Sequence, residues 1–288
     1  MTEISTSTVV KLRKISGQGM MDCKNALNQA NGDIDKALEI LRKKGLATLA
    51  KRAERETSEG VVISTANDDK KVTGLATLCC ETDFVAKSND FITAANAMTD
   101  YILHCSADEG IENLLETAVN GKKLRDVITE VVSKTGEKIE VGDYARYKLD
   151  SPGLISVYVH FNKKVGAMVQ MDTDTEETSK SPVIAQVAAD IAMHVTAAKP
   201  LALDKDGIDQ KIIEQEKAIY AEQIKNKPAN IIDKIVEGKL KKFFAENCLL
   251  EQPFVKDDTK TVGEIIAQAA KQCTGKATIR RFVRFGVG

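Results

Sequence analysis

The sequence has little of what platforms for sugars or nucleic-acid bases need: aromatic residues make up 5% of its 288 residues, and tryptophan is absent. It also lacks an excess of charge of either sign, because 41 Lys and Arg are balanced by 42 Asp and Glu. A net charge of −1 produces no overall field that would attract a nucleic acid or an acidic membrane. General affinity for polyanions is therefore excluded, and any such partner would need a local patch.

Long apolar runs are missing as well. No stretch approaches the roughly 18 uninterrupted apolar residues of a membrane helix, and the N-terminal MTEISTSTVVKLRK lacks the charged-then-apolar order of a signal peptide. The six cysteines form no Cys-x-x-Cys pair, which is typical of reduced, structural thiols. We therefore expect a cytoplasmic protein that does not bind a membrane.

Residues 1–56 are predicted to form a three-helix module followed by a linker. Apolar residues recur at helical spacing, glycines supply the turns between the helices, and Asp33 is placed to cap the third helix. The cations at 42–44 suit the C-terminal end of that helix, and the polar residues 51–60 are typical of a linker.

The middle of the chain contains an internal repeat with an offset of 93 residues. Both copies have the pattern of a strand, a polar turn, a second strand and a helix, with the helices near 89–103 and 181–197. A hairpin followed by a helix favours antiparallel sheets and an α+β fold. The pattern predicts two similar core subdomains, residues 57–150 and 151–204. The repeated residues are Gly60, Lys70, Lys71 and Val72, which return as Gly153, Lys163, Lys164 and Val165.

The pattern changes after Pro200. A charged helix is predicted over 208–226, with an apolar stripe that includes Ile212, and Pro228 separates it from a second helix that ends near Ala245. We interpret this pair as a protruding helical hairpin, with residues 205–227 as its first arm. Residues 228–288 then supply the return helix and the C-terminal part of the core, including a helix at 261–273 and a basic final strand.

No constellation of side chains points to catalysis. His104, His160 and His194 are too few and too scattered to form a nucleophile–base pair or a metal site. The Ser-Gly-Gln-Gly segment lacks the preceding strand and the Lys-Ser/Thr of a phosphate loop. We therefore expect no catalytic residue, no metal and no cofactor, and a protein that is not an enzyme.

Two segments are more informative about binding. A helix that opens with Met20 and Met21 cannot bury both side chains against one neighbour, because adjacent positions lie about 100° apart. One of them is therefore available for a partner. The segment ETDFVAKSNDF is predicted to form a loop in which Phe84 follows Asp83; a helix cap with Phe84 in the core is an equally good interpretation. A third segment, IVEGKLKKFFAENCLLEQPFVKD, is typical of ordinary core packing.

These three segments, together with IAMHVTAAKP, resemble the signatures of the elongation factor Ts family of bacteria, and they occur in the family's order over nearly the whole chain. One departure is Ser16-Gly17-Gln18-Gly19, where the family usually has Thr-Gly-Ala-Gly. Another is the end at Gly288, where some members carry a further helix; we assign no contact to such a helix. The resemblance implies a guanine-nucleotide exchange factor for elongation factor Tu.

The resemblance also implies how the partner is bound. The N-terminal module, similar to ubiquitin-associated (UBA-like) domains, would dock on the GTP-binding domain of elongation factor Tu, and the loop with Phe84 would insert near its magnesium site. Residues 205–227 match a segment used for self-association in some members, which would give a homodimer. No nucleic acid is implied as a direct partner. The residues implied at the interface are Arg13, Met20, Met21, Thr82, Asp83, Phe84, Val85 and His160.

Three alternatives remain open from the residues alone. The first is a helical adaptor whose N-terminal module captures an unrelated helix. The second is RNA binding by the basic tail. The third is a thiol-dependent enzyme built on Cys79 or Cys80. The tail residues are Arg280, Arg281, Phe282, Arg284 and Phe285.

Overall fold

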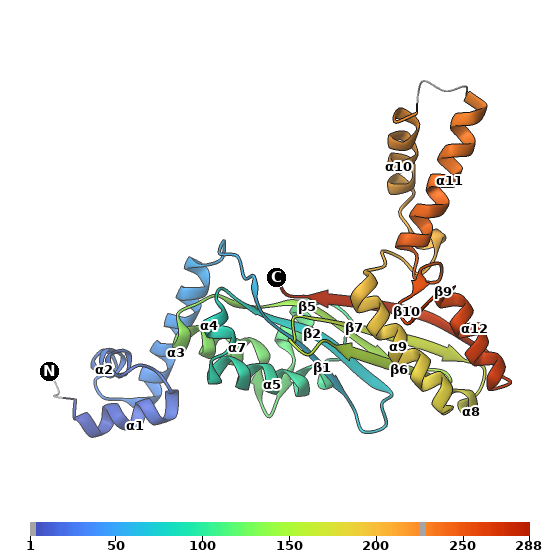
Figure 1. Ribbon diagram of the computed structural model, residues 1–288. Coiled ribbons are helices and arrows are strands. Elements are labelled where there is room, and N and C mark those ends of the chain that lie inside the picture. The colour runs from blue at the N-terminus through green and yellow to red at the C-terminus, as the bar shows by residue number, and fades with distance from the viewer. Residues whose placement is uncertain (1–3, 225–228) are drawn as a thin grey trace.

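The computed structural model describes residues 4–224 and 229–288, which form a three-helix module, a core of two three-stranded sheets and a projecting helical hairpin (Figure 1). The module lies at one end of the molecule, and the hairpin rises from the core toward the other end. This α+β architecture with antiparallel sheets confirms the predicted fold class. No helix within these two ranges is long and apolar enough to cross a membrane.

The N-terminal module consists of α1 (Thr6–Ser16), α2 (Met20–Gln29) and α3 (Ile34–Lys51). Asp33 caps α3 as predicted, because its side chain accepts a hydrogen bond from the Lys36 backbone N–H at 3.1 Å. The prediction that α3 ends at the cations 42–44 is wrong. The helix continues to Lys51 because its second half packs on the core helix α7 (Leu124–Thr135).

The contact between α3 and α7 depends on Gly45. A Cβ atom at this position would lie 2.6 Å from the Thr129 carbonyl oxygen and 3.0 Å from the Ser133 Cβ, both on α7. The close approach also lets the Ser133 hydroxyl donate to the Leu41 carbonyl oxygen at 3.1 Å. Glycine therefore allows the module to dock directly on the core.

Gly45→Ala is expected to lower the free energy of unfolding by about 1–3 kcal/mol, because the added methyl group overpacks this contact. The matched control is Gly238→Ala in α11 (Ala229–Asn247), where an added Cβ has no atom within 4 Å. The control is expected to raise stability by up to about 1 kcal/mol, because alanine favours a helix over glycine. Denaturant unfolding of both variants measures the difference, and equal stabilities would contradict the docking role of Gly45.

The first sheet contains three antiparallel strands in the order β1–β2–β5. One face packs on α5 and α7 through a cluster that includes Leu78, Phe91 and Ile102. The other face meets the second sheet through Leu75, Tyr147 and other buried residues. Because both faces are covered, β2 is buried along almost its whole length. The bounds are β1 (Glu59–Ala66), β2 (Val72–Cys80), β5 (Ile139–Lys148) and α5 (Asn89–His104).

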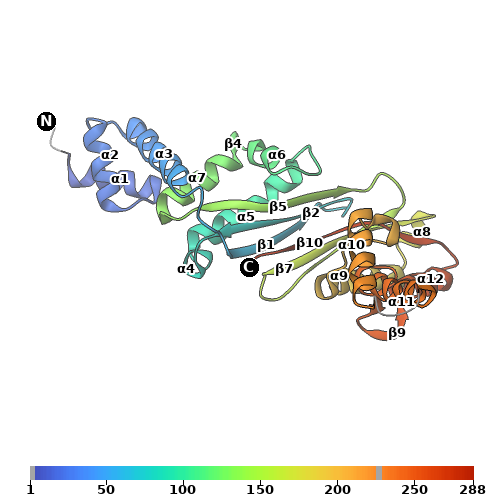
Figure 2. The same cartoon turned by 90° about the horizontal axis from the view of Figure 1, so that it is seen from above.

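The second sheet repeats this plan in the order β10–β7–β6, with α9 and α12 packed on its outer face. Figure 2 shows both sheets in the middle of the molecule, where the second sheet packs against the first and β2 contacts both β7 and β10. The 93-residue offset does not reveal the third strands β5 and β10 as repeated elements, because each follows its hairpin after a long insertion. The bounds are β6 (Gly153–Val159), β7 (Val165–Thr173), β10 (Ala277–Gly286), α9 (Pro182–Ala198) and α12 (Val262–Gln272).

The backbone conformation repeats at the predicted offset of 93 residues. Lys70 and Lys163 occupy equivalent turn positions and share a φ of 55°. The two hairpins have the same register, and each is followed by a one-turn helix, α4 (Asp83–Ala86) or α8 (Glu176–Ser179). The duplication therefore extends further than the hairpin and long helix. The smaller elements between them are α6 (Ile111–Glu116), β3 (Ala118–Val119), β4 (Lys122–Lys123), β8 (Pro253–Phe254) and β9 (Asp257–Thr261).

The hairpin is inserted in the second repeat, after α9. It consists of the short helix η1 (Lys205–Gly207), α10 (Gln210–Glu222) and α11, and it stands away from the sheets (Figure 1). Its base is buried around Ile213 and Leu240. The predicted apolar stripe through Ile212 is wrong by one residue: Ile212 is 39% exposed, whereas Ile213 packs inward. The predicted break at 225–228 lies outside the described residues.

Candidate functional site

The segment around Phe84 forms a one-turn helix, α4, and the prediction of a loop is therefore wrong. The Thr82 hydroxyl accepts a hydrogen bond from the Val85 backbone N–H at 3.4 Å and caps this turn. Val85 packs against the core of the first subdomain, while Phe84 is 83% exposed. The alternative interpretation was thus right about the cap and wrong about a core Phe84. The turn presents one large apolar side chain to solvent.

Two carboxylates stabilise this turn from different sides. Glu137, which follows α7, accepts hydrogen bonds from both the backbone N–H of Thr82 at 3.1 Å and its hydroxyl at 2.7 Å. Within the turn, Asp83 pairs with Lys87 at 2.7 Å. The hydrogen bond from Lys87 lowers the pKa of Asp83 below its usual value. The backbone that carries Phe84 is therefore held in one conformation.

The α1–α2 turn presents the two methionines. Met20 is 40% exposed and Met21 is 65% exposed, so both are accessible rather than one of them as predicted. Arg13 is also exposed, on the last turns of α1. Gly17 approaches Lys134 so closely that a Cβ would lie 2.8 Å from the lysine Nζ. The end of α7 thus contacts the methionine turn through Lys134 and the Phe84 turn through the nearby Glu137.

Gln18 lies behind the methionine turn and departs from the alanine that the resemblance predicts. Its side chain is 4% exposed, and its Oε1 has no hydrogen-bond partner among the described residues. A buried acceptor without a donor costs about 1–3 kcal/mol of stability. The packing of the module therefore does not explain why a polar side chain occupies position 18.

Gln18→Ala is expected to raise the free energy of unfolding by about 1 kcal/mol, because it removes this unsatisfied oxygen. Gln170→Ala is the control: Gln170 is fully buried, but its amide bonds to Asp172 and Arg281. The free energy of unfolding of this control is expected to fall by about 1–3 kcal/mol, because the hydrogen bonds of Gln170 are lost. Urea unfolding measures the free energy of unfolding of both variants. A similar loss of stability in Gln18→Ala and Gln170→Ala would contradict the unsatisfied state of the Gln18 oxygen.

His160 lies in the turn between β6 and β7, together with a residue that sequence analysis missed. The Tyr158 hydroxyl lies 3.1 Å from the His160 Nδ1, and the ring of Phe161 lies 4.4 Å from the His160 ring. Phe161 is 88% exposed. It was missed because VYVHF has the pattern of a buried strand. The repeat carries the signal, since an offset of 93 aligns Phe161 with Asp68 in a polar turn.

The Phe84 turn and the His160 turn lie on either side of the start of β1. Glu59, the first residue of β1, is opposite Cys80 at the end of β2 and forms an ion pair with Lys164. The Val62 backbone N–H also donates to the Lys163 carbonyl oxygen at 2.7 Å. We call one set of side chains the binding surface: the exposed Arg13, Met20, Met21, Phe84 and Phe161, and the half-buried His160. It presents apolar side chains on fixed turns, an arrangement suited to binding another protein.

The cysteines next to this surface do not form a nucleophile. Cys79 and Cys80 are buried. Burial raises the pKa of the Cys79 thiol and, with help from the Glu137 charge, raises the pKa of Cys80 to about 12. A thiol with such a pKa is protonated at neutral pH, and the thiolate is the reactive form. The observation that suggested a thiol enzyme is therefore explained by packing.

The basic tail forms β10, an edge strand of the second sheet that pairs with β7. Arg281 stacks on Tyr147, with its guanidinium carbon 4.0 Å from the ring centre. The Arg284 Nε donates to the Thr196 carbonyl oxygen at 3.0 Å, and Arg280 lies 3.7 Å from Asp172. The cations that suggested RNA binding thus make contacts within the chain.

His194, in the IAMHVTAAKP segment, is a structural residue at the base of the hairpin. Its Nδ1 accepts a hydrogen bond from the Val255 backbone N–H at 3.2 Å, so its Nε2 carries the proton that is donated to Gln252 at 2.9 Å. Burial lowers its pKa. A neutral His194 therefore joins α9 to the segment that follows α11.

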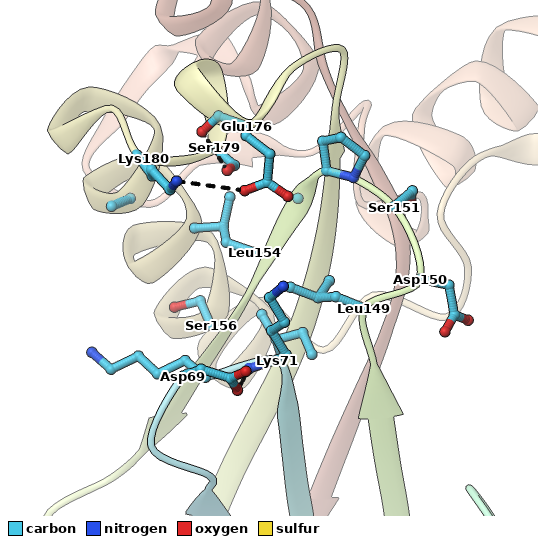
Figure 3. Close-up of a pocket in the computed structure, with 15 residues that line it drawn as sticks. Asp69, Lys71, Leu149, Asp150, Ser151, Leu154, Ser156, Glu176, Ser179 and Lys180 are labelled. Atoms are coloured by element: carbon cyan, nitrogen blue, oxygen red, sulfur yellow. Dashed lines mark hydrogen bonds and ion pairs between the residues drawn. The ribbon is translucent and has the colours of Figure 1, made fainter.

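A polar cleft of about 660 Å³ lies between the β1–β2 turn, the β5–β6 connection and α8 (Figure 3). Three lysines and three carboxylates line it, so their charges cancel, and Glu176 pairs with Lys180 across 3.9 Å. In the part of the chain that the structure describes, no group of three or more His, Cys, Asp or Glu could hold a metal ion. The strongest candidate site is therefore the binding surface.

Comparisons with known proteins agree on one family. A family model described as "Elongation factor TS" matches residues 81–288. A protein of a Nitratiruptor species, named "Elongation factor Ts", is 41% identical over 287 residues, which cover 99% of this chain and 93% of the relative. Proteins with the same name from Clostridium perfringens and Desulfovibrio desulfuricans are 38% and 37% identical; the alignments cover 99% of this chain in both cases, and 93% and 98% of the relatives.

Proposed function

Because the chain belongs to the elongation factor Ts family, we propose that it is a guanine-nucleotide exchange factor for elongation factor Tu. It binds the GDP complex in the cytoplasm and promotes release of GDP during translation elongation. The observation that carries this proposal is the exposed Phe84 on its anchored turn. Because the turn that carries Phe84 is already ordered in the free protein, the side chain can enter a cleft of a partner without the cost of ordering that turn.

Exchange requires no acid or base, because no covalent bond is made or broken. It requires a coupling free energy: the factor weakens nucleotide binding, and nucleotide weakens binding of the factor equally. Burial of one phenylalanine is worth about 1.5–3 kcal/mol, which is comparable with a typical coupling of about 1–3 kcal/mol. Insertion of Phe84 beside the magnesium and phosphate site can therefore supply the coupling.

The other groups of the binding surface supply affinity. Met20 and Met21 offer flexible apolar side chains for the GTP-binding domain, and Arg13 adds a cation beside them. His160, with its neighbour Phe161, contacts the partner from the second subdomain. The fixed turns support tight binding, because rigid groups lose little conformational entropy in a complex.

Self-association is a separate part of the proposal and concerns the hairpin. Ile212 and Ile219 on α10 are 39% and 49% exposed, on a hairpin that projects from the core. In a twofold-symmetric dimer, both side chains would be buried against the same patch of a second copy. These exposed residues support a homodimer through α10.

The exchange proposal is tested by measuring the affinity of the chain for elongation factor Tu in its nucleotide-free and GDP-bound forms. Coupling predicts that the chain binds the nucleotide-free form more tightly, by about 5- to 150-fold. Equal affinities for the two forms would show that the chain binds without promoting exchange. No binding to either form would favour the helical adaptor for another partner.

A further inference from the structure

The end of α3 is joined to the start of the Phe84 turn by an ion pair. Arg52, which caps the C-terminus of α3, donates from its Nη1 to both carboxylate oxygens of Glu81, at 2.8 and 2.7 Å. Glu81 is the residue immediately before Thr82. This pair therefore connects the module that carries the methionines to the turn that carries Phe84.

The ion pair is partly shielded from solvent and is fixed by a third group. The Glu81 side chain is 15% exposed and that of Arg52 is 37% exposed. The Lys138 backbone N–H donates to the Glu81 Oε1 at 2.7 Å. Burial alone would raise the pKa of Glu81, but the hydrogen bonds from Lys138 and Arg52 lower it. Glu81 is thus held as a carboxylate that orients Arg52.

The connections form a closed frame. Glu81 and Thr82 bind Lys138 and Glu137, which are consecutive residues just after α7. The helix α7 in turn packs along α3, and α3 ends at Arg52. A change in the angle between α3 and α7 would move Met20 and Met21 relative to Phe84, and the Arg52–Glu81 pair resists that change.

We propose that Arg52 is a positioning residue for exchange, which holds the N-terminal module at the orientation that lets the methionines and Phe84 bind one partner together. This inference rests on the proposed function. Arg52 lies outside the binding surface and acts through Glu81. A lysine can replace its charge, but it lacks the planar guanidinium geometry.

The test compares Arg52→Gln with Arg55→Gln, which removes a charge that also acts on Glu81 but leaves the hydrogen bonds to Glu81 in place. Release of fluorescent GDP from elongation factor Tu is measured at increasing concentrations of each variant. Arg52→Gln is expected to raise the concentration for half-maximal release about 5- to 10-fold, as expected for a lost charge-assisted hydrogen bond. Arg52→Lys should recover part of the loss, and Arg55→Gln should behave as the wild type.

A double-mutant cycle separates positioning from a general loss of stability. If Arg52 acts by aligning Phe84 with the methionines, Arg52→Gln should add little in a Phe84→Ala background. Thermal unfolding should differ little between Arg52→Gln and Arg55→Gln. Wild-type behaviour of Arg52→Gln, or full additivity with Phe84→Ala, would overturn the inference while leaving the exchange proposal intact. If the wild-type chain did not accelerate GDP release from elongation factor Tu, both the inference about Arg52 and the exchange proposal would be wrong.

Discussion

Phe84→Ala is expected to lower the maximal rate of GDP release from elongation factor Tu by about 10- to 100-fold, while the fold remains intact. The side chain is 83% exposed in the free protein, so its removal leaves no cavity in the core. In the complex, the variant loses about 1.5–3 kcal/mol of apolar burial, and every 1.4 kcal/mol corresponds to about tenfold. Because this burial drives the coupling, saturating amounts of the variant should not restore the rate.

The duplicated core supplies a matched control for Phe84. Glu177 occupies the equivalent position of the one-turn helix α8, which is capped by Thr175 in the same way as α4 is capped by Thr82. Glu177→Ala is expected to release GDP at the wild-type rate. Equal unfolding midpoints for both variants would show that the fold is unchanged. Wild-type exchange by Phe84→Ala would show that the turn does not provide the coupling.

The double substitution of Met20 and Met21 by alanine should affect binding rather than coupling. We expect the concentration for half-maximal release to rise about 10- to 100-fold, because two exposed apolar contacts are lost from the complex. The maximal rate at saturation should stay near that of the wild type, because Phe84 is still present. A titration of GDP release against variant concentration measures both quantities.

Leu201 provides the control for the methionines. It is 61% exposed, much like Met21, but lies at the base of the hairpin. Leu201→Ala is expected to leave both the half-maximal concentration and the maximal rate unchanged. If the double methionine variant instead lowered the maximal rate with unchanged affinity, the division of roles between the two turns would be wrong.

Regular sequence patterns predict most of the fold. The helical spacing and caps of the N-terminal module predict three helices, and the 93-residue offset predicts two related α+β units, both of which the structure contains. Residues 105–138 had no such signal, and α6, β3, β4 and α7 were not predicted there. The extension of α3 to Lys51 was also missed, because a close contact between Gly45 and Thr129 determines it and no local pattern reveals such a contact.

The binding surface was predictable only in part. The adjacent methionines indicate exposure because of helix geometry, but ETDFV alone does not decide whether Phe84 is exposed or buried. That decision depends on Glu137, which is 55 residues away and bonds to Thr82. Phe161 lies in the segment VYVHF, which has the apolar composition of a buried strand. Only the alignment of Phe161 with Asp68 in the first repeat indicates that it lies in a turn. Long-range hydrogen bonds therefore determine the surface that the local sequence leaves undecided.

The proposed function is acceleration of nucleotide exchange on elongation factor Tu. The most direct measurement follows fluorescent GDP bound to elongation factor Tu after addition of excess unlabelled nucleotide and a substoichiometric amount of this chain. We expect faster release, with each copy of the chain acting on many molecules of elongation factor Tu. A release rate equal to that without the chain would contradict it.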